Sequence, residues 1–330
     1  MNSINRNLGL SLARVTEIAA IECGKWMGRG DKIAADQAAV NGMRRMFDTI
    51  DIDGTVVIGE GEKDEAPMLY IGERIGKASA HAPMVDIAVD PLDGTTSTAK
   101  GLSNAISVIA VAPKGTLYNT EVYYMEKIAV GPEAKGCIDL NKPLKDNLIA
   151  IAVALGKNLE DLTVTIQERD RHDAYIKQCR ELGCRIKLFR DGDVGMAIAT
   201  CIEDSGIDVL VGIGGAPEGV LAAAAMRCLG GEIQGRLFPM TQEEKLKAPK
   251  EDFDRVLTID ELVKTNEVIF VATGVSDGDM LKGVRYLSGS RVKTHSVVMR
   301  GETGTVRYIE AIHNMDKKIA YADVYAAPGE

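Results

Sequence analysis

Two carboxylates lie three positions apart in the stretch DPLDGTT, the most distinctive part of this sequence. Asp90 and Asp93 follow an apolar run, Val85 to Val89, that is predicted to form a strand. The proline and glycine of the stretch favour a tight turn, and Thr95 and Thr96 begin a segment whose free amides favour an anion. Two hard oxygen ligands beside an anion site indicate a divalent metal ion facing a phosphate group. The alternative is an ordinary aspartate-rich turn with a threonine cap.

Further acidic residues are predicted at the ends of elements, where an adjacent strand or helix could bring them near the first pair. Glu60 lies in the stretch GEGE, which ends a predicted strand, Thr55 to Gly59, and Asp36 lies at the start of a predicted helix. Glu218 follows Pro217, a residue favoured at the first helical position, so we expect this carboxylate to recruit a cation or sugar hydroxyls. The simpler alternatives are a solvated loop for Glu60 and a charge that complements the helix dipole for Glu218.

A basic stretch follows the predicted strand Leu162 to Ile166. Arg169 and Arg171 are suited to bidentate contact with a terminal phosphate, although a solvated strand end is the alternative interpretation. We expect His172 to be structural, because no nucleophile stands near it in the sequence and no G-x-S-x-G motif supports a serine hydrolase.

Composition excludes several functional classes. The chain has 330 residues, with 48 acidic against 39 basic side chains and a net charge of -9, which disfavours nucleic acid as a partner. Its apolar runs fall far short of the roughly 20 residues of a membrane span, and the start MNSINRN does not resemble a secretory signal. The six cysteines are too scattered for a disulfide scaffold or a zinc site, so we expect reduced thiols in a cytoplasmic protein.

The periodicity of apolar residues changes along the chain. Helices are predicted over Leu8 to Gly28 and Ala34 to Phe47, and a further strand over Ala105 to Val111, without a regular alternation. From about Asn147 strands and helices alternate, which predicts a doubly wound layer. The polar segment Met240 to Arg255 is expected at the rim. The alternating strands are Leu162 to Ile166, Ile186 to Phe189, Val209 to Ile213 and Val268 to Val271, and the helices are Asp173 to Leu182, Val194 to Cys201 and Pro217 to Leu229.

Together these stretches resemble the metal-dependent, lithium-sensitive sugar and inositol phosphatases, whose shared signature is a strand followed by DPxDGT. A closer resemblance, to class II (GlpX-type) fructose-1,6-bisphosphatases, extends over nearly the whole chain. It implies a layered α/β/α/β/α sandwich of two lobes (the sugar phosphatase fold). Residues 1–145 would form a metal-binding α+β lobe and residues 146–330 an α/β substrate lobe, and the tail 292–313 could return to the first. The matching stretches are GRGDKIAADQAAV (28–40), DGTVVIGEGEKDEAPMLYIGE (53–73), VDIAVDPLDGTT (85–96), YMEKIAVGPEAKG (124–136), RHD (171–173), DGDV (191–194), GIGGAPEGV (212–220) and VATGVSDGDMLKGV (271–284).

Carried over to matching positions, the resemblance implies a metal site and a substrate site. Two or more Mg²⁺ or Mn²⁺ ions would be held by Asp36, Glu60, Asp90, Asp93 and Glu218, and Thr95, Glu60 and Asp90 would take part in catalysis. Asp93 stands where many GlpX relatives carry Glu. Lys127 is a weaker candidate for substrate contact. The substrate-binding positions would be Asp93, Gly94, Thr95, Tyr124, Arg169, Asp170, Arg171, Asp191, Gly192, Asp193 and Gly215.

The implied reaction is metal-dependent hydrolysis of the 1-phosphate of fructose 1,6-bisphosphate to fructose 6-phosphate and phosphate, in gluconeogenesis or related sugar phosphate metabolism. The metal ions would activate a water, Thr95 would orient it, and Glu60 could help to accept its proton. The resemblance further implies a homo-oligomer, either a dimer or a tetramer.

Other functions stay open or are excluded. The substrate could instead, or also, be sedoheptulose 1,7-bisphosphate or an inositol phosphate, and the chain could be a non-catalytic sensor that binds metal and phosphate. Dinucleotide binding is excluded because the glycines between positions 212 and 219 do not satisfy G-x-G-x-x-G, since position 217 is Pro, and no P-loop motif occurs.

Overall fold

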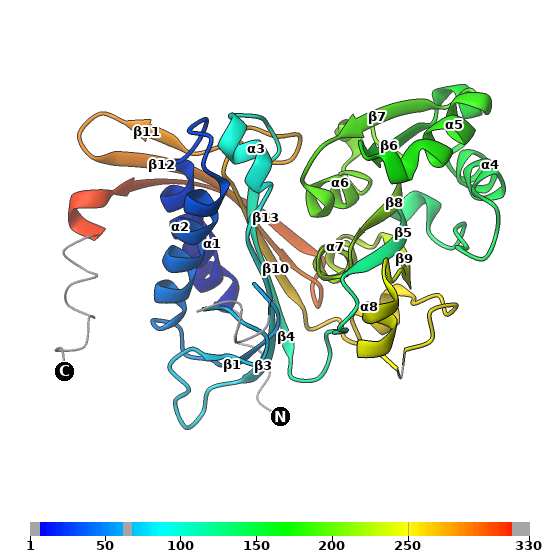
Figure 1. Cartoon of the computed structure of the whole chain (residues 1–330). Helices are drawn as coiled ribbons and strands as arrows, with labels where there is room; N and C mark the ends of the chain where they lie inside the picture. Colours follow the sequence, from blue (N-terminus) through cyan, green and yellow to red (C-terminus); the bar gives the residue numbers. More distant parts are fainter. Residues whose placement is uncertain (1–6, 62–67, 250, 319–330) are drawn as a thin grey trace.

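Two β-sheets run through the molecule, with helices on their outer faces and between them (Figure 1). The computed structural model describes residues 7–61, 68–249 and 251–318, so that part of the matching stretch 53–73 lies outside the described residues. The layers are α1 (Leu8–Gly24) and α2 (Lys32–Phe47), an eight-stranded sheet, α6 (Asp193–Ala199) and α7 (Ala216–Leu229), a five-stranded sheet, and α4 (Leu144–Leu155) and α5 (Asp173–Glu181). This order confirms the predicted α/β/α/β/α fold class.

The first layer consists of two helices that the apolar periodicity predicted. α1 (Leu8–Gly24) buries residues at helical spacing, and it ends at Gly24 rather than at residue 28. α2 (Lys32–Phe47) begins after Asp31, whose carboxylate accepts a hydrogen bond from the Ala34 amide at 2.9 Å and so satisfies a free donor of the first turn. Both helices pack on the outer face of the eight-stranded sheet.

The eight-stranded sheet contains strands from both ends of the chain. Its order is β11-β12-β10-β4-β3-β1-β2, and β13 pairs with the free side of β12, so the tail returns to the sheet of the N-terminal half. β1 and β3 are parallel and the other neighbours are antiparallel. Its strands are β1 (Asp53–Ile58), β2 (Arg74–Ile75), β3 (Met84–Asp93), β4 (Ile106–Pro113), β10 (Ile269–Gly274), β11 (Arg285–Leu287), β12 (Arg291–Arg300) and β13 (Thr305–Asn314).

The five-stranded sheet, in the order β7-β6-β8-β5-β9, has a parallel part and an antiparallel part. β6 is parallel to β7 and β8, as a doubly wound layer requires, whereas β5 is antiparallel to β8 and β9. The assignment of Val268 to Val271 to this layer was wrong, because β10 pairs with β4 and β12 instead. The strands are β5 (Tyr124–Val130), β6 (Thr163–Gln167), β7 (Arg185–Phe189), β8 (Val209–Gly215) and β9 (Glu232–Leu237).

Helices connect these strands, and two of them form the middle layer. α7 packs between the two sheets beside α6, while α4 and α5 cover the outer face of the second sheet. α8 lies within the polar segment predicted at the rim. The remaining helices are α3 (Thr95–Lys100), α4 (Leu144–Leu155), α5 (Asp173–Glu181), α6 (Asp193–Ala199), α7 (Ala216–Leu229), α8 (Gln242–Lys247) and α9 (Ile259–Leu262), with 3-10 turns η1 (Pro132–Ala134), η2 (Leu159–Asp161), η3 (Asp170–His172) and η4 (Glu203–Ser205).

The chain crosses from the first sheet to the second before the predicted lobe boundary at residue 145. β5 already belongs to the second sheet, so the chain passes from one sheet to the other between β4 and β5. The division into lobes 1–145 and 146–330 stays a prediction.

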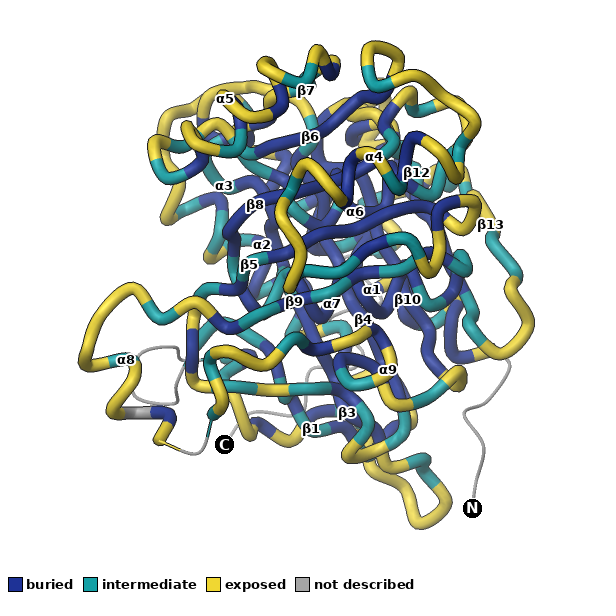
Figure 2. Tube along the Cα trace, turned by 90° about the vertical axis from the view of Figure 1, so that its right-hand side faces the viewer, coloured by how far each residue is buried: buried dark blue, intermediate teal, exposed yellow. Residues whose placement is uncertain are grey.

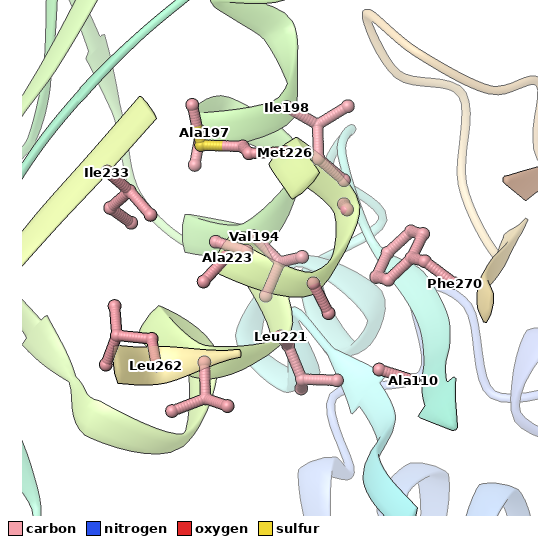
Figure 3. Packing of buried hydrophobic residues seen from close by; sticks show 14 of the residues in the cluster. Ala110, Val194, Ala197, Ile198, Leu221, Ala223, Met226, Ile233, Leu262 and Phe270 are labelled. Atoms are coloured by element: carbon pink, nitrogen blue, oxygen red, sulfur yellow. The ribbon is translucent and has the colours of Figure 1, made fainter. Parts of the chain in front are cut away.

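A shared hydrophobic core joins the two sheets. Leu221 and Ala223 of α7, Phe270 of the first sheet and Ile233 of the second sheet all belong to this cluster of buried side chains (Figure 3). Burial is nearly complete along β4, β10, α7 and β8 (Figure 2). Small alanine side chains let the helix fit between two sheets at native packing density.

Two expectations from composition can be compared with the structure. All six cysteines are free thiols, buried or half-buried, as predicted. Within the described ranges, no helix is both long enough and apolar enough to cross a membrane.

Candidate active site

A cleft of about 1480 Å³ opens where the two sheets and the middle helices meet, and α8 lies at its rim. Every predicted site residue lines it except Asp170 and the weaker candidate Lys127. The cleft therefore gathers positions that lie as far apart in the sequence as Asp36 and Glu218.

The five predicted metal ligands come from four neighbouring elements. Asp36 lies in the second turn of α2 and Glu60 follows the end of β1. β1 runs parallel to β3, so Glu60 comes near Asp90 at the same end of the sheet. Glu218 approaches from the first turn of α7 on the opposite wall, where Pro217 precedes it.

The DPLDGTT stretch differs from the predicted turn. β3 continues through Asp93, and its pairing with β4 is interrupted between Asp90 and Asp93. Pro91 has no amide to donate to the ladder, which explains the irregularity at this point. The sharp bend comes at Gly94, where φ is +109° and an added Cβ would lie 3.0 Å from the backbone of Ala105. Both carboxylates are thus held on the strand rather than in a loop.

Burial raises the pKa of every carboxyl in the cluster, and repulsion between its members adds to this effect for Glu60, Asp90 and Asp93. For Glu60, burial and then the charge of Asp36 raise the pKa to about 8. Burial also raises the pKa of Asp90 well above its usual range, and the charge of Asp93 adds to this effect. The pKa of Asp93 is well above its usual range through burial and the charge of Glu218, and burial raises those of Asp36 and Glu218. Such a cluster favours bound protons or cations.

The cluster offers the donor chemistry of a site for divalent cations. Asp93 Oδ2 and Glu218 Oε2 are buried and have no hydrogen-bond partner, so both oxygens are available as ligands. Within the described residues, no three acidic, histidine or cysteine side chains already form a group that could hold one ion. The residue types therefore fit Mg²⁺ or Mn²⁺, whereas their present arrangement is not a complete coordination shell.

Thr95 lies beside this cluster at the first position of α3. It lines the cleft and is half-buried. Its hydroxyl has no hydrogen bond to any residue that the structure describes. This position leaves the hydroxyl available to a ligand in the cleft.

Hydrogen bonds made by Asp191, which lies between β7 and α6, join this side of the cleft to α3 and to Arg169. Asp191 accepts hydrogen bonds from the Ser97 amide at 2.9 Å and from Arg169 Nη2 at 3.2 Å. The backbone of Val194 lowers the pKa of Asp93, against the effect of burial, so the start of α6 lies beside the end of β3. Asp191 was predicted to bind the substrate, and in the structure its carboxylate has these protein partners.

Two arginines supply positive charge to the cleft. Arg171 Nε donates to the carbonyl of Ile213 at 2.9 Å, and its guanidinium lies 5.3 Å from the centre of the Tyr124 ring. Arg169 donates to the carbonyl of Arg190 at 2.9 Å. These contacts fix both guanidinium groups in the cleft wall, where they could receive a phosphate.

Lys127 is a buried cation behind the acidic cluster. Its side chain is 3% exposed, forms an ion pair with Asp193 and donates to the carbonyl of Gly215 at 3.0 Å. Its charge partly offsets the raised pKa of Glu218. Lys127 does not line the cleft, so the structure favours a supporting position over the substrate contact considered from the sequence.

The neighbouring residues of the basic stretch lie outside the cleft. Asp170 is exposed in η3, and its predicted role in substrate binding stays a prediction. His172 is fully buried, with Nδ1 2.7 Å from the Gln167 carbonyl and Nε2 accepting from the Ile213 amide at 2.8 Å. These two bonds agree with the structural role expected for this histidine, and burial lowers its pKa.

Comparison with known proteins agrees with this geometry. A family model described as bacterial fructose-1,6-bisphosphatase, glpX-encoded, matches residues 6–313. The chain belongs to this family. It is 48% identical to fructose-1,6-bisphosphatase 1 class 2 of Escherichia coli (strain K12) and to fructose-1,6-bisphosphatase class 2 of Shigella flexneri. Each match covers 96% of this chain and 97% of the relative.

Several residues of the cleft were not predicted. The loop before β5 contributes Asn119 to Tyr123, and Gln167 lies beside the two arginines. Glu244 and Glu251 come from the segment predicted only as a rim. The polar character of that segment was a signal for exposure, but nothing in the sequence indicated that it closes one side of the cleft.

Proposed function

We propose that this chain is a metal-dependent phosphatase that hydrolyses the 1-phosphate of fructose 1,6-bisphosphate to fructose 6-phosphate and phosphate. The observation that carries the proposal is the cluster of five carboxylates beside the free Thr95 hydroxyl, in a cleft whose opposite wall holds Arg169 and Arg171. Membership of the bacterial fructose-1,6-bisphosphatase family supports the choice of substrate. One end of a bisphosphate would meet the acidic cluster and the other the arginines.

The residues at the acidic end would prepare a water for attack. When bound to Asp36, Glu60, Asp90, Asp93 and Glu218, Mg²⁺ or Mn²⁺ would supply Lewis-acid chemistry that makes water a better nucleophile and neutralises charge on the leaving oxygen. The Thr95 hydroxyl would orient the attacking water by accepting or donating a hydrogen bond. Glu60 would be kept ionised by bound metal ions, against the burial that raises its pKa, so that its carboxylate would accept the proton that this water loses. One P–O bond forms to water, and the bond to the sugar oxygen breaks.

The other end of the cleft would hold the sugar and the phosphate that is retained. Arg169 and Arg171 are placed to bind that phosphate, because both side chains line the cleft and are fixed by carbonyl oxygens. Gly192, Gly214 and Gly215 line the cleft, and an added Cβ at Gly214 or Gly215 would collide with the carboxylate of Asp193 or Glu218, so these two glycines let the acidic side chains reach the site. We further propose that Tyr124 and Asp193 contact the sugar.

The decisive experiment is phosphate release from fructose 1,6-bisphosphate, sedoheptulose 1,7-bisphosphate and inositol 1-phosphate, each with Mg²⁺, Mn²⁺ or EDTA. We expect release to require metal, to be fastest with the fructose substrate, and to fall at least about 100-fold in Asp90→Asn. Faster release from the seven-carbon substrate would keep the mechanism and change the substrate. Binding of the sugar bisphosphates without turnover would instead indicate a sensor. A cytoplasmic location and a homo-oligomeric state remain part of this proposal.

A further inference from the structure

Tyr123 lies in the cleft beside the acidic cluster, and no role described so far accounts for it. It belongs to the loop before β5, lines the cleft together with Glu218, and is 56% exposed. The charge of Glu218 and then burial raise the pKa of Tyr123 to about 12, and the charges of Asp90 and Glu60 act in the same direction. The phenol therefore lies near three of the five carboxylates, and it is protonated at neutral pH.

The backbone at Tyr123 is fixed to the helix that carries Glu218. Its carbonyl oxygen accepts a hydrogen bond from the amide of Ala216, the first residue of α7, at 2.7 Å. Tyr124 then begins β5 and pairs with Gly215 at the end of β8. The same junction of β5, β8 and α7 thus holds both the phenol and the carboxylate of Glu218.

The ring of Tyr123 continues a row of side chains that reaches across the cleft. It contacts the ring of Tyr124 edge to face, with 4.9 Å between the ring centres and 77° between the planes. The guanidinium of Arg171 lies 5.3 Å from the centre of the Tyr124 ring. The row therefore begins at an arginine placed to bind the retained phosphate and ends at Tyr123, beside the acidic cluster.

The hydroxyl of Tyr123 has no hydrogen bond to any residue in the described ranges, whereas several other tyrosine hydroxyls have fixed protein acceptors. The tyrosines with such acceptors are Tyr118 (Glu251), Tyr175 (Glu126) and Tyr286 (the Ile21 carbonyl). A phenolic donor that is unpartnered in an open cleft is suited to a ligand with acceptor oxygens.

We propose that Tyr123 is a substrate-binding residue whose phenol donates a hydrogen bond to an oxygen of the phosphate group that is cleaved. This inference rests on the proposed function, which places that phosphate at the acidic end of the cleft. The oxygens of a phosphate dianion only accept hydrogen bonds, and ionised carboxylates cannot donate any, so a neutral donor is favourable at this end. Hydrogen bonds to charged acceptors are stronger than those between neutral groups.

The binding test uses the two products of the reaction, so that it does not depend on turnover. With Mn²⁺ and saturating fructose 6-phosphate, which occupies the sugar and far-phosphate part of the cleft, titration calorimetry measures the affinity for inorganic phosphate at the acidic end. We expect Tyr123→Phe to weaken this binding at least about tenfold and to change the affinity for fructose 6-phosphate by less than about twofold. The preserved affinity for fructose 6-phosphate shows that the variant is folded. Unchanged phosphate binding, or a loss confined to fructose 6-phosphate, would overturn the proposal.

The kinetic test compares two substrates that carry the cleaved phosphate on the same carbon. Tyr123→Phe keeps the ring contact with Tyr124 and removes only the hydroxyl. We expect kcat/KM to fall at least about tenfold, and by the same factor, with fructose 1,6-bisphosphate and sedoheptulose 1,7-bisphosphate. A loss with only one of them would assign the phenol to the sugar instead. The matched control is Tyr308→Phe on β13, because Tyr308 is 53% exposed and does not line the cleft, so both constants should be unchanged.

Failure of this inference can be told apart from failure of the proposed function. If wild type hydrolyses neither sugar bisphosphate, the proposed function is wrong, and titration of inorganic phosphate with Mn²⁺ alone then decides the role of Tyr123. A tenfold weaker affinity in Tyr123→Phe would still support the phosphate contact, whereas equal affinities would overturn it. If wild type is active and Tyr123→Phe matches it with both substrates, only the assignment of Tyr123 fails.

Discussion

The hydroxyl of Thr95 is the most direct single-residue test of the mechanism, because it lines the cleft and forms no bond to the described part of the chain. We expect Thr95→Val, which keeps the shape and removes the hydroxyl, to lower kcat by about 100-fold or more. The Michaelis constant for the sugar bisphosphate should change little, since the arginines bind the far phosphate. Steady-state phosphate release measures both constants.

The matched control for this position is Thr95→Ser, which keeps the hydroxyl and loses only a methyl group. Its kcat should stay within about tenfold of wild type. Equal losses of kcat in the valine and serine variants would mean that the methyl group and its packing matter, rather than the hydroxyl.

The contribution of the ion pair between Lys127 and Asp193 to stability can be measured without any substrate. Lys127→Met would leave the half-buried carboxylate of Asp193 unpaired, which should lower the free energy of unfolding by about 3 kcal/mol. Adding Asp193→Asn should recover part of that loss, because the uncompensated charge is then absent. Urea unfolding measures both effects. Lys142→Met is the control, since the Lys142 pair with Asp139 is exposed and should contribute less than about 0.5 kcal/mol.

At the scale of elements, the packing of β13 on α1 depends on a buried histidine. His313 Nε2 lies 2.8 Å from the Thr294 hydroxyl and 3.9 Å from a carboxylate oxygen of Glu17. Burial and then the charge of Lys318 lower the pKa of His313 to about 4. Burial raises the pKa of Glu17, whereas Lys318 and Arg14 lower it. Because its own pKa is lowered to about 4, His313 is neutral near pH 7 beside this carboxyl.

This lowered pKa predicts a loss of stability in acid. Between pH 6.5 and 4 the unfolded chain binds a proton on His313 that the folded chain does not, so the free energy of unfolding falls as the pH falls. The contribution is at most about 1.4 kcal/mol per pH unit. His313→Gln should flatten the decline over this window, as measured by urea unfolding at several pH values. Parallel curves for wild type and variant would show that His313 does not titrate in this way.

Local patterns predicted most elements but not how the strands pair. The helix Leu8–Gly24 and the alternating strands and helices from β6 to α7 show their apolar periodicity within short stretches of sequence, so the sequence alone predicts them. β10 has the same apolar pattern as β8, and only long-range pairing with β4 places it in the other sheet. The bulge at Pro91 likewise depends on a partner strand.

At the scale of the whole molecule, the cleft exists because both sheets pack on one middle layer. The residues of the acidic cluster could be named from the sequence, because each was expected at or near the end of an element and the family resemblance implied a shared role for them. The sequence did not predict that Lys127 supports Asp193, or that Asp191 joins α3 to Arg169, because those contacts form only when the two sheets meet. Because these contacts need both sheets in place, we expect the two sheets with their helices to unfold together.

Cooperative unfolding can be tested through α7, whose Leu221 is fully buried between the sheets. We expect Leu221→Ala to lower the free energy of unfolding by about 2 to 5 kcal/mol, because it removes apolar contacts within the core cluster that joins the two sheets and leaves a cavity. The single tryptophan, Trp26, packs on the core beside α1 and so reports on the first sheet, whereas far-ultraviolet circular dichroism reports on the whole chain.

The two signals should change together with urea in wild type and should shift together in Leu221→Ala. The exposed residue Val153 on α4 provides the control, because Val153→Ala should change stability by less than about 0.5 kcal/mol. Two separate steps, with only one of them moved by Leu221→Ala, would mean that each sheet folds with its own core and that the cleft can lose one wall while the other stays folded.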